Sequence, residues 1–507
     1  MKSGYPLLNK ALIFTFLICM LFSLQDCAQR IDPVVRISNG YIRGTAEDQS
    51  LVFKGIPYAS PPVGARRFKS PRPALNWKDT LSCENFGNVA SQHGGTNGIQ
   101  GAEDCLTLNV YTPAKAIKSK LPVLVWVHGG GMTGGSGKSQ NGHAFSDQDS
   151  VVTVTINYRL GVFGFLYLGD KGKDYQSSGN NGLLDCIMAL KWIRKNISAL
   201  GGDPSRVTVM GQSAGAKLVS TLLVSPQAKG YFSQLILESG SVQCIRDTVT
   251  AKAIRLRLLN ALNLTKASDL LKLPADQLIA AQDKVCGGAQ GTNYFGPVQD
   301  GIVITKDPYL HLKHHRNTSV RVLAGTNTGE SKMFMDADKR LYHPDEEVLK
   351  AWFGNNYPFV FSSYQKATKS GHTAAATADV LTQYMYQMHT YRLINALADN
   401  GNPLWVYHFK YSRDNTLANH AQELQYVWFL PHLQQYNEDE MQLGQQMHTA
   451  WVNFIKGKNP GKVNGLEWPL YQNRMPAALS FDRVSAPVIL DDIFNDQFYP
   501  SSGFLLN

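Results

Sequence analysis

The strongest candidate for a reactive side chain is a serine between two glycines, in the stretch VTVMGQSAGAKL at residues 207–218. Ser213 is the centre of a Gly-x-Ser-x-Gly pattern, and a serine hydroxyl in such a turn attacks a carbonyl carbon when a base takes its proton. The pattern is short and the chain holds 44 glycines, so a chance match is the competing interpretation. The surrounding sequence must supply a strand, a helix, a base and an acid.

A glycine run provides a second chemical signal. His128 follows the apolar segment 121–127 and is itself followed by three glycines, which let backbone amides approach a substrate oxygen closely. An ordinary glycine-rich loop is the alternative. The position after a core strand favours an oxyanion hole, with the amides of Gly130, Gly131 and Ala214 as donors.

The base is expected late in the chain, because proteins with a strand–Gly-x-Ser-x-Gly–helix turn carry the serine, the acid and the histidine in that chain order. The candidates are His389, His408, His420, His432 and His448. His408 lies inside an expected strand and His448 in a helical pattern, whereas His420 lies in a polar loop after that strand. We therefore expect His420 to be the general base.

The acid that orients the histidine is sought just past the end of another strand. VRVLAG at residues 320–325 predicts a strand, and the TNTGE that follows ends on Glu330. The carboxyl ends of parallel strands form the functional edge of a sheet, so Glu330 is the expected acid. Asp300 and Asp336 are rivals, and Asp300, next to Gly301, is typical of a turn.

The elements that must position these residues alternate between strand and helix. Short apolar segments indicate strands buried on both faces, at 121–127, 151–156, 206–210, 234–239, 320–325 and 404–409. Helical patterns separate them, notably at 182–200. The alternation predicts an α/β fold, a central and mostly parallel twisted sheet flanked by helices, and the strand–serine–helix stretch is the nucleophile elbow of the α/β-hydrolase fold.

Two further regions complete the predicted architecture. NGYIRG and FKGIPYA indicate a small antiparallel meander ahead of the main sheet. Residues 245–318 and 333–400 are helix-rich insertions, expected to form a cap over one end of the sheet.

The N-terminus resembles a targeting segment. An uncharged run at residues 11–24 follows Lys2 and Lys10, with a length typical of a signal peptide and short for a membrane span. We expect a signal peptide over 1–28 and one hydrolase domain over 29–507, exported to the periplasm or secreted, without stable membrane insertion. A lipid anchor on Cys27 and an uncleaved anchor are the alternatives to cleavage after Ala28.

Composition narrows the class of partner. The chain is 43% hydrophobic and 17% charged, which fits a globular protein with a large core. Its net charge of +10 is spread thinly rather than clustered, so no nucleic-acid partner is expected. Serine chemistry needs no metal or organic cofactor, and the expected partner is a small-molecule ester.

Seven cysteines are present, of which Cys19 and Cys27 fall in the targeting segment. The other five are Cys83, Cys105, Cys186, Cys244 and Cys286. Export permits disulfides, and an odd count leaves at least one free thiol. Cys186, in the apolar helical pattern LLDCIMALKWI, is the best candidate for a buried, inert thiol.

Together these stretches resemble the type-B carboxylesterase and cholinesterase family of the α/β-hydrolase superfamily. The similarity runs from about residue 35 to the C-terminus. It includes the blocks NYRLGVFGFL (157–166), GTNTGE and NHAQEL, and its most specific parts are EDCLTLNVYTP (103–113) and the extended elbow GGDPSRVTVMGQSAG (201–215).

The resemblance implies a role for each candidate. Ser213 would be the nucleophile, His420 the base and Glu330 the acid. The amides of Gly130, Gly131 and Ala214 would form the oxyanion hole. It also implies structural pairs: a Cys83–Cys105 disulfide, an Arg67–Glu103 ion pair, and an acid farther along for Arg159, such as Asp379.

Departures from the family pattern qualify this picture. Gln212 stands before the serine where much of the family has Glu, and Met132 follows the glycines where an aromatic residue is common. The 83–105 loop holds no Trp, so choline esters are not expected. Cys244 and Cys286 are spaced more widely than the family's second disulfide, and their pairing is left open.

The expected function is a secreted serine hydrolase of small to medium uncharged carboxylic esters, acting through an acyl-enzyme. A non-catalytic adhesion or binding protein on the same fold is one alternative, and the retained serine, histidine and acid argue against it. An amide, lactone or thioester hydrolase with the same triad is another.

Overall fold

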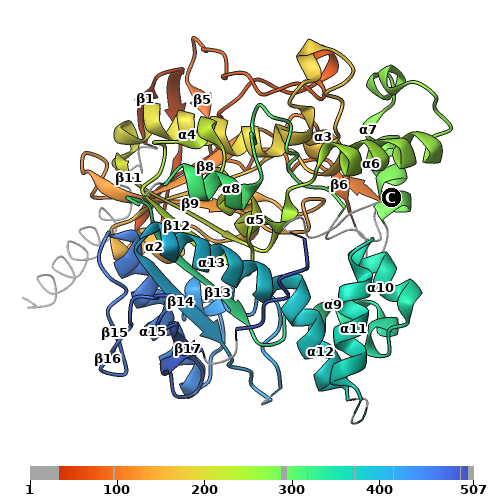
Figure 1. Ribbon diagram of the computed structural model, residues 1–507. Helices are drawn as coiled ribbons and strands as arrows, with labels where there is room; N and C mark the ends of the chain where they lie inside the picture. The colour runs from red at the N-terminus through yellow and green to blue at the C-terminus, as the bar shows by residue number, and fades with distance from the viewer. Residues whose placement is uncertain are drawn as a thin grey trace, which may run out of the picture.

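An eleven-stranded mixed sheet forms the centre of this computed structural model (Figure 1). In spatial order its strands are β18 (Ala486–Ile489), β17 (Ala477–Phe481), β14 (Leu404–Phe409), β13 (Arg321–Asn327), β12 (Gln234–Glu238), β11 (Gly202–Gln212), β9 (Leu121–Val127), β10 (Val152–Ile156), β8 (Thr107–Pro113), β4 (Ser50–Pro57) and β3 (Thr45–Glu47). Neighbours pair in parallel from β17 through to β10, and antiparallel at both edges. All six strands expected from apolar segments are confirmed, and all lie in the parallel part.

The structure describes residues 33–94, 98–286, 294–316, 318–369, 371, 373–414, 416–490 and 493–500. The expected signal peptide, with Cys19 and Cys27, lies outside these ranges. Within them, no helix combines the length and the apolar character that crossing a membrane requires.

Both faces of the sheet are buried, which explains the continuous apolar strands. Along β9, Val123, Val125 and Val127 belong to one core cluster, while Leu124 and Trp126 belong to another. A strand whose alternate side chains enter two different cores cannot tolerate a polar face. Helices therefore cover the sheet on both sides.

The helices follow the strands in sequence. They are α2 (His143–Asp149), α3 (Gly161–Phe165), α4 (Asn181–Asn196), α5 (Ala214–Leu222), α6 (Thr248–Ala261), α7 (Ala275–Cys286), α8 (Pro308–His314), α9 (Lys332–Ala337), α10 (Glu346–Phe353), α11 (Tyr357–Ala367), α12 (Ala374–Thr382), α13 (Met388–Asn400), α14 (Leu424–Val427) and α15 (Glu438–Ile455). α4 and α5 contribute to the first core cluster, and α2 and α15 to the second. The helix expected at 182–200 is confirmed as α4 with a short 3₁₀ extension, Ile197–Leu200.

The expected insertions are confirmed as helical. Helices α9 to α12 form a lobe at the lower right of Figure 1, with a core of its own that includes Leu349, Trp352 and Leu381. Between α12 and α13 the chain makes a π-helical turn, η12 (Gln383–Gln387). π turns are rare and are frequent at functional sites.

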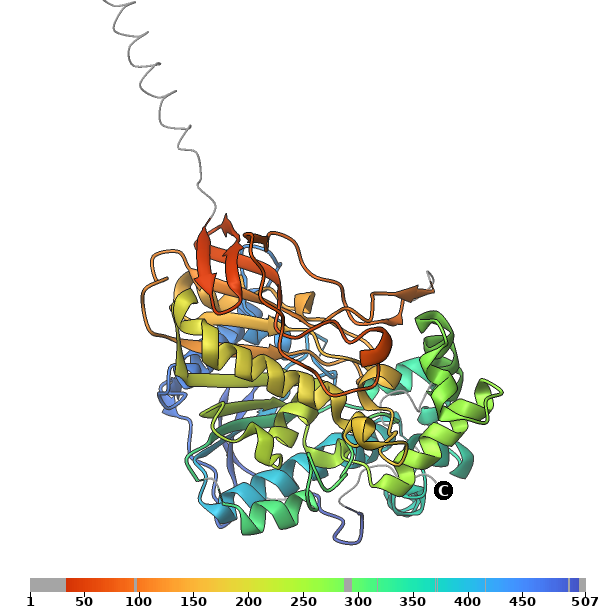
Figure 2. The same cartoon turned by 90° about the horizontal axis from the view of Figure 1, so that it is seen from above.

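The N-terminal strands differ in part from the expected meander. NGYIRG forms β2 (Gly40–Arg43), which pairs antiparallel with β1 (Val34–Ile37) and parallel with β5 (Leu81–Ser82) in a separate small sheet. Figure 2 shows this small sheet in red at one side of the molecule. FKGIPYA instead contributes most of β4 to the large sheet, because its hydrogen bonds are made with β8 rather than with β2.

Helix α5 lies unusually close to strand β9. A Cβ atom added to Gly215 would collide with the carbonyl oxygen of Val127, and one added to Gly211 would lie 2.5 Å from the carbonyl carbon of Gly215. Both contacts are with backbone, which cannot swing aside. The glycines that flank Ser213 are therefore required for the helix to lie against the sheet.

Gly215→Ala should lower the free energy of unfolding by roughly 1–3 kcal/mol, as for other overpacked sites, because α5 must move away from β9. Urea denaturation measures the change. Gly134→Ala is the matched control, because its methyl would have as its nearest neighbour Gln92 Oε1 at 3.4 Å, an ordinary contact. Equal effects of the two substitutions would contradict the close approach.

Candidate active site

Ser213 stands at the turn between β11 and α5 in a backbone conformation that few residues adopt. Its φ is 55° and its ψ −123°. A non-glycine residue held there stores strain, which commonly marks a functional site. The first-turn amides of α5, beginning with Ala214, have no carbonyl partner within the helix and point toward the serine.

The expected oxyanion loop lies beside this serine. Gly130 and Gly131 have φ values of 105° and 62°, and both line the same cavity as Ser213. The carbonyl of Gly130 accepts hydrogen bonds from the amides of Thr133 and Gly134, at 3.1 and 2.9 Å, which makes the loop a tight turn. Met132, also at positive φ, is buried beneath it.

His128 supports this loop from below. Its ring stacks on Tyr158 with centroids 4.4 Å apart, and Tyr158 donates a hydrogen bond from its hydroxyl to the His128 carbonyl at 2.8 Å. Burial lowers the pKa of His128 to about 4. This histidine is therefore neutral at physiological pH and acts as a structural spacer.

The expected base and acid meet in the structure. His420 Nδ1 lies 2.5 Å from Glu330 Oε2, although the two residues are 90 positions apart. Glu330 is fully buried, and its Oε1 accepts hydrogen bonds from Ser239 Oγ at 2.6 Å and from the Asn327 amide at 2.7 Å. These donors hold the carboxylate in one orientation toward the ring.

The other nitrogen of His420 faces the serine turn. Gln212 Nε2, next to Ser213, lies 3.2 Å from His420 Nε2, and the Tyr386 hydroxyl lies 3.5 Å away. The amide nitrogen of Gln212 can only donate, so Nε2 accepts and the ring proton sits on Nδ1 toward Glu330. That tautomer is the one able to take a proton from a serine.

A bridge between two loops brings His420 to Glu330. The Gly329 amide donates to the Ala418 carbonyl at 2.8 Å, and Asn327 Nδ2 donates to the Asn419 carbonyl at 2.7 Å. Both loops leave adjacent parallel strands, β13 and β14. An isolated parallel bridge between Gly329 and Asn419 therefore joins the two loops at the residues directly before Glu330 and His420.

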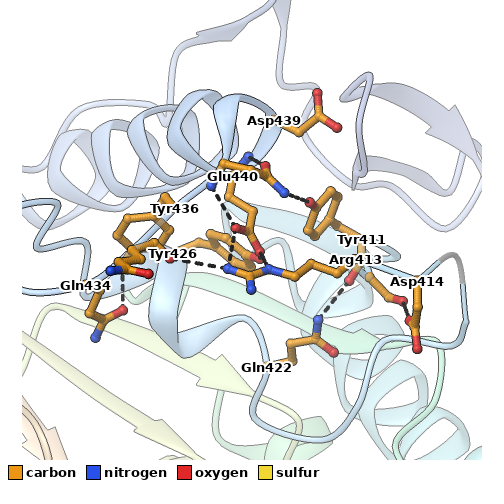
Figure 3. A network of polar contacts seen from close by, with 12 residues as sticks. Tyr411, Arg413, Asp414, Gln422, Tyr426, Gln434, Tyr436, Asp439 and Glu440 are labelled. Atoms are coloured by element: carbon orange, nitrogen blue, oxygen red, sulfur yellow. Dashed lines mark hydrogen bonds and ion pairs between the residues drawn. The ribbon is translucent and has the colours of Figure 1, made fainter.

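The loop that carries His420 is anchored to helix α15 (Figure 3). Arg413 Nε and Nη2 each donate to a carboxylate oxygen of Glu440, at 2.7 and 2.8 Å. Glu440 also receives the Tyr426 hydroxyl at 3.2 Å and completes a capping box with Asn437 at the start of the helix. A bidentate guanidinium–carboxylate pair has a preferred geometry. It therefore fixes the orientation of the loop in addition to binding it to the helix.

The cavity in front of Ser213 has a volume of about 430 Å³. One wall is Gly130, Gly131 and Thr133, another is Gln212, Ser213, His420 and Ala421, and the insertion supplies Met333, Phe334, Ala337, Asp338 and Trp352. The insertion wall is mostly apolar. Its one acid, Asp338, is hydrogen-bonded to Arg340, which holds the pKa of that carboxyl at about 2.

The rival histidines and acids lie elsewhere. Burial lowers the pKa of His389 to about 3 and that of His408 to about 4, and His448 contacts Asp149 at 2.8 Å. Asp300 accepts the amides of residues 302–304, which is the turn role expected of it, and Asp336 pairs on the surface with lysines. None of these, nor His432, lines the Ser213 cavity.

The sequence patterns do not point to Glu423, a buried carboxyl near Glu330, or to Glu238, a buried carboxyl near Glu423. Glu423 accepts from Asn327 Nδ2 at 2.5 Å, and Glu238 accepts from Trp451 Nε1 at 2.8 Å. Burial, with a further rise from nearby Glu330, raises the pKa of Glu423 to about 8. Burial and then Glu423 raise the pKa of Glu238 well above its usual range. The one available signal was a Glu inside the apolar strand QLILES.

The structure contains one of the two ion pairs expected from the family resemblance. The Arg67–Glu103 ion pair is confirmed, with Arg67 Nε 2.7 Å from Glu103 Oε2. The acid expected for Arg159, Asp379, is wrong: Arg159 pairs with Asp185 on α4, Nε to Oδ2 at 2.8 Å, because both are buried side by side under the sheet.

The disulfide expected between Cys83 and Cys105 is absent from the structure. Both are free, buried thiols of the main core, and burial raises the pKa of Cys83 to about 12, so that the reactive thiolate is disfavoured. Cys186, Cys244 and Cys286 are free and buried as well, which agrees with the expected inert thiol at Cys186 and leaves Cys244 and Cys286 unpaired.

In the described part of the chain, one group of side chains has the spacing of metal ligands. Asp48, His143 and Asp147 place ligand atoms within 4.8 Å of one another. His143 Nδ1 is hydrogen-bonded to Asp147 Oδ1 at 3.0 Å, so these groups already satisfy each other. None of the three residues lines the Ser213 cavity.

Comparisons with known proteins agree on one family. A family model described as the carboxylesterase family matches residues 31–488. The para-nitrobenzyl esterase of Bacillus subtilis (strain 168) is 32% identical over 479 residues, covering 89% of this chain and 94% of that protein. Liver carboxylesterase 1 of Oryctolagus cuniculus is 29% identical over 83% of each.

Solved structures give the same result for the fold. The crystal structure of a Geobacillus stearothermophilus carboxylesterase superposes with a TM-score of 0.81 at 33% identity, covering 90% of this chain and 98% of that one. A PNB esterase structure superposes with a TM-score of 0.80 at 30% identity, covering 91% and 98%. The expected α/β-hydrolase fold is confirmed.

Glu423→Gln should remove a pH-dependent loss of stability. The folded chain keeps the Glu423 proton up to about pH 8, whereas the carboxyl has an ordinary pKa of 4.5, so the free energy of unfolding falls as pH rises between these values. Urea denaturation at pH 5 and pH 8 measures the free energy of unfolding of both proteins. The value for the variant minus the value for the wild type should increase with pH by up to about 1.4 kcal/mol per pH unit.

Glu440→Gln is the control of opposite sign. The hydrogen bond from Arg413 lowers the pKa of Glu440, so its carboxylate stabilises the fold at neutral pH and loses that effect as pH falls. That variant should lose stability at pH 8. Parallel pH curves for Glu423→Gln and wild type would mean that Glu423 is ionised in the folded protein.

Proposed function

Because the chain belongs to the carboxylesterase family and is a carboxylic-ester hydrolase, we propose that Ser213, His420 and Glu330 are its nucleophile, general base and orienting acid. The observation that carries this proposal is the 2.5 Å contact of His420 Nδ1 with Glu330, in the cavity that Ser213 lines. A buried carboxylate there favours the imidazolium that forms when the serine loses its proton.

The reaction then proceeds in two halves. Ser213 Oγ attacks the ester carbonyl while its proton moves to His420 Nε2, and the carbonyl oxygen becomes an anion held by the amides of Gly130, Gly131 and Ala214. The carbon–oxygen bond to the alcohol breaks as Nε2 returns the proton to it. A water molecule then attacks the acyl-enzyme through the same proton transfers, and the carboxylic acid product leaves.

The proposed substrates are small to medium uncharged esters. A cavity of about 430 Å³ is of the size that holds a small molecule, and the side chains of Phe334, Trp352 and Met333 offer it apolar contact. Asp338 is already paired with Arg340, so the cavity offers no free charge of its own to a cationic alcohol. A panel of acyl chains and of ester, amide, lactone and thioester linkages would separate these substrate classes.

We also propose that the protein is exported. The support is the sequence of residues 1–28, with two lysines ahead of an uncharged apolar run. The five cysteines outside the targeting segment are free thiols in the structure, so disulfides give no support to export.

Ser213→Ala should lower kcat for p-nitrophenyl butyrate by at least about 10⁴-fold, as loss of a catalytic serine does elsewhere. Ser220→Ala is the matched control: it lies in the same helix, and its hydroxyl donates only to the Lys217 carbonyl at 2.9 Å. The control should keep wild-type activity and label with a fluorophosphonate probe. A Ser213→Ala enzyme as fast as the wild type would overturn the proposal.

Gln212→Glu should move the acid limb of the kcat/KM profile to higher pH by about one unit, because a carboxylate near His420 Nε2 stabilises the imidazolium. The present side chain is 3.2 Å from that nitrogen. Gln422→Glu adds the same charge to the His420 loop, where the side chain binds the Asn419 amide and the Tyr411 carbonyl, and should leave the limb in place. Identical shifts would mean that net charge alone is responsible.

A further inference from the structure

Tyr386 brings a hydroxyl to the reacting groups from a distant part of the chain. It belongs to the π turn η12, in the second insertion, and only 2% of its surface is exposed. Its ring centroid lies 4.6 Å from that of His420, with 38° between the planes. The residue has no role in the mechanism derived so far.

The hydroxyl of Tyr386 is directed at one of the two atoms between which the proton moves. It lies 3.5 Å from His420 Nε2. Burial raises the pKa of this hydroxyl above its usual range, with nearby Glu330 adding to the rise and the Ser213 hydroxyl opposing it. The phenol therefore keeps its proton and remains a hydrogen-bond donor.

The leaving oxygen must approach His420 Nε2, the atom beside which the Tyr386 hydroxyl lies. His420 Nε2 takes a proton from Ser213 and returns it to the alcohol, so the alcohol oxygen has to come within hydrogen-bond distance of the same nitrogen. By microscopic reversibility, the water that cleaves the acyl-enzyme occupies that place too. Gln212 Nε2 and the Tyr386 hydroxyl lie 3.2 and 3.5 Å from Nε2, so both are within reach of an oxygen bound there.

We propose that Tyr386 is a further catalytic residue, whose hydroxyl donates a hydrogen bond to the leaving oxygen during acylation and holds the attacking water during deacylation. This inference rests on the proposed roles of Ser213 and His420. It adds a donor on the leaving-group side, whereas the amides of Gly130, Gly131 and Ala214 serve the carbonyl oxygen.

Each proton has a defined path in this scheme. During acylation the Ser213 proton moves to Nε2, the bond from Oγ to carbon forms, the bond to the alcohol breaks, and Nε2 gives its proton to that oxygen. Tyr386 keeps its own proton and contributes only a hydrogen bond, which strengthens as negative charge builds on the leaving oxygen. In deacylation, the water oxygen bonds to the acyl carbon while water gives one proton to Nε2, the bond from that carbon to Oγ breaks, and Nε2 gives its proton to Oγ.

Two contacts hold the Tyr386 ring in position. Phe334, which lines the cavity, stacks nearly parallel to it, with centroids 6.2 Å apart and an angle of 13°. The ammonium of Lys217, four residues after the nucleophile on α5, lies 5.3 Å from the ring centroid. A cation over a phenol ring is attracted to its π electrons, so α5 and the insertion both position the hydroxyl.

Tyr386→Phe tests the inference, because it keeps the ring and these contacts and removes only the hydroxyl. Ethyl butyrate expels a strongly basic alkoxide, whereas p-nitrophenyl butyrate expels a stable phenolate that needs little help. We expect kcat/KM to fall about 10-fold, equivalent to about 1.4 kcal/mol, for the ethyl ester and less than about two-fold for the p-nitrophenyl ester. The deacylation rate after the p-nitrophenol burst should fall about 10-fold as well.

Tyr384→Phe is the matched control. It removes a hydroxyl from the same π turn, but that hydroxyl contacts Ser363 and Asp496, each at 2.8 Å, rather than the reacting groups. Its ratio of ethyl to p-nitrophenyl kcat/KM should equal that of the wild type. Circular dichroism and thermal midpoints of both variants confirm that they fold.

Equal losses on both esters, or no loss on either, would overturn the role at the leaving oxygen, and an unchanged deacylation rate would overturn the role in holding water. The proposed function fails differently. A wild-type enzyme without a burst, or a Ser213→Ala enzyme that keeps one, would overturn the nucleophile, whereas an active, burst-forming wild type with an unaltered Tyr386→Phe variant overturns this inference alone.

Discussion

The register of four parallel strands is the constraint on which the site depends. Gln212 at the end of β11 pairs with Glu238 on β12, Glu238 with Gly325 on β13, and Gly325 with Tyr407 on β14. Backbone hydrogen bonds thus align the ends of strands that are separated by long stretches of chain. The loops that leave β11, β13 and β14 carry Ser213, Glu330 and His420, so a shift of one of these strands by one residue would move its residue away from the other two.

Burial determines whether the carboxyl groups of Glu423 and Glu238 are protonated. Glu423 lies close to Glu330 and Glu238 lies close to Glu423, the side chains that donate hydrogen bonds to them are those of Asn327 and Trp451 rather than cations, and burial raises the pKa of both carboxyls. Several carboxylates cannot all be charged in a space from which water is excluded, and protonation is the least costly solution. The donors around Glu330, from Ser239 and Asn327, mark it as the carboxylate prepared to face the histidine.

The insertions turn a sheet edge into a cavity. The parallel sheet supplies the serine turn and the glycine loop, but Phe334 and Trp352 come from the second insertion, as does Tyr386. That region has its own core, so it can hold a wall of the cavity without help from the sheet. Much of the cavity wall is therefore made of residues that do not belong to the sheet.

The sequence by itself determined the fold class and the parallel strands, and it pointed to Ser213, Glu330 and His420 as residues that follow the ends of those strands, because these depend on local patterns: apolar runs, a glycine-flanked serine and loops after strands. Only the tertiary structure decided which distant groups meet. Asp185 rather than Asp379 faces Arg159, β4 joins the large sheet, Glu423 lies near Glu330, and Tyr386 lies against His420. Nothing local distinguishes these residues, since their roles come from the burial and contacts that packing creates.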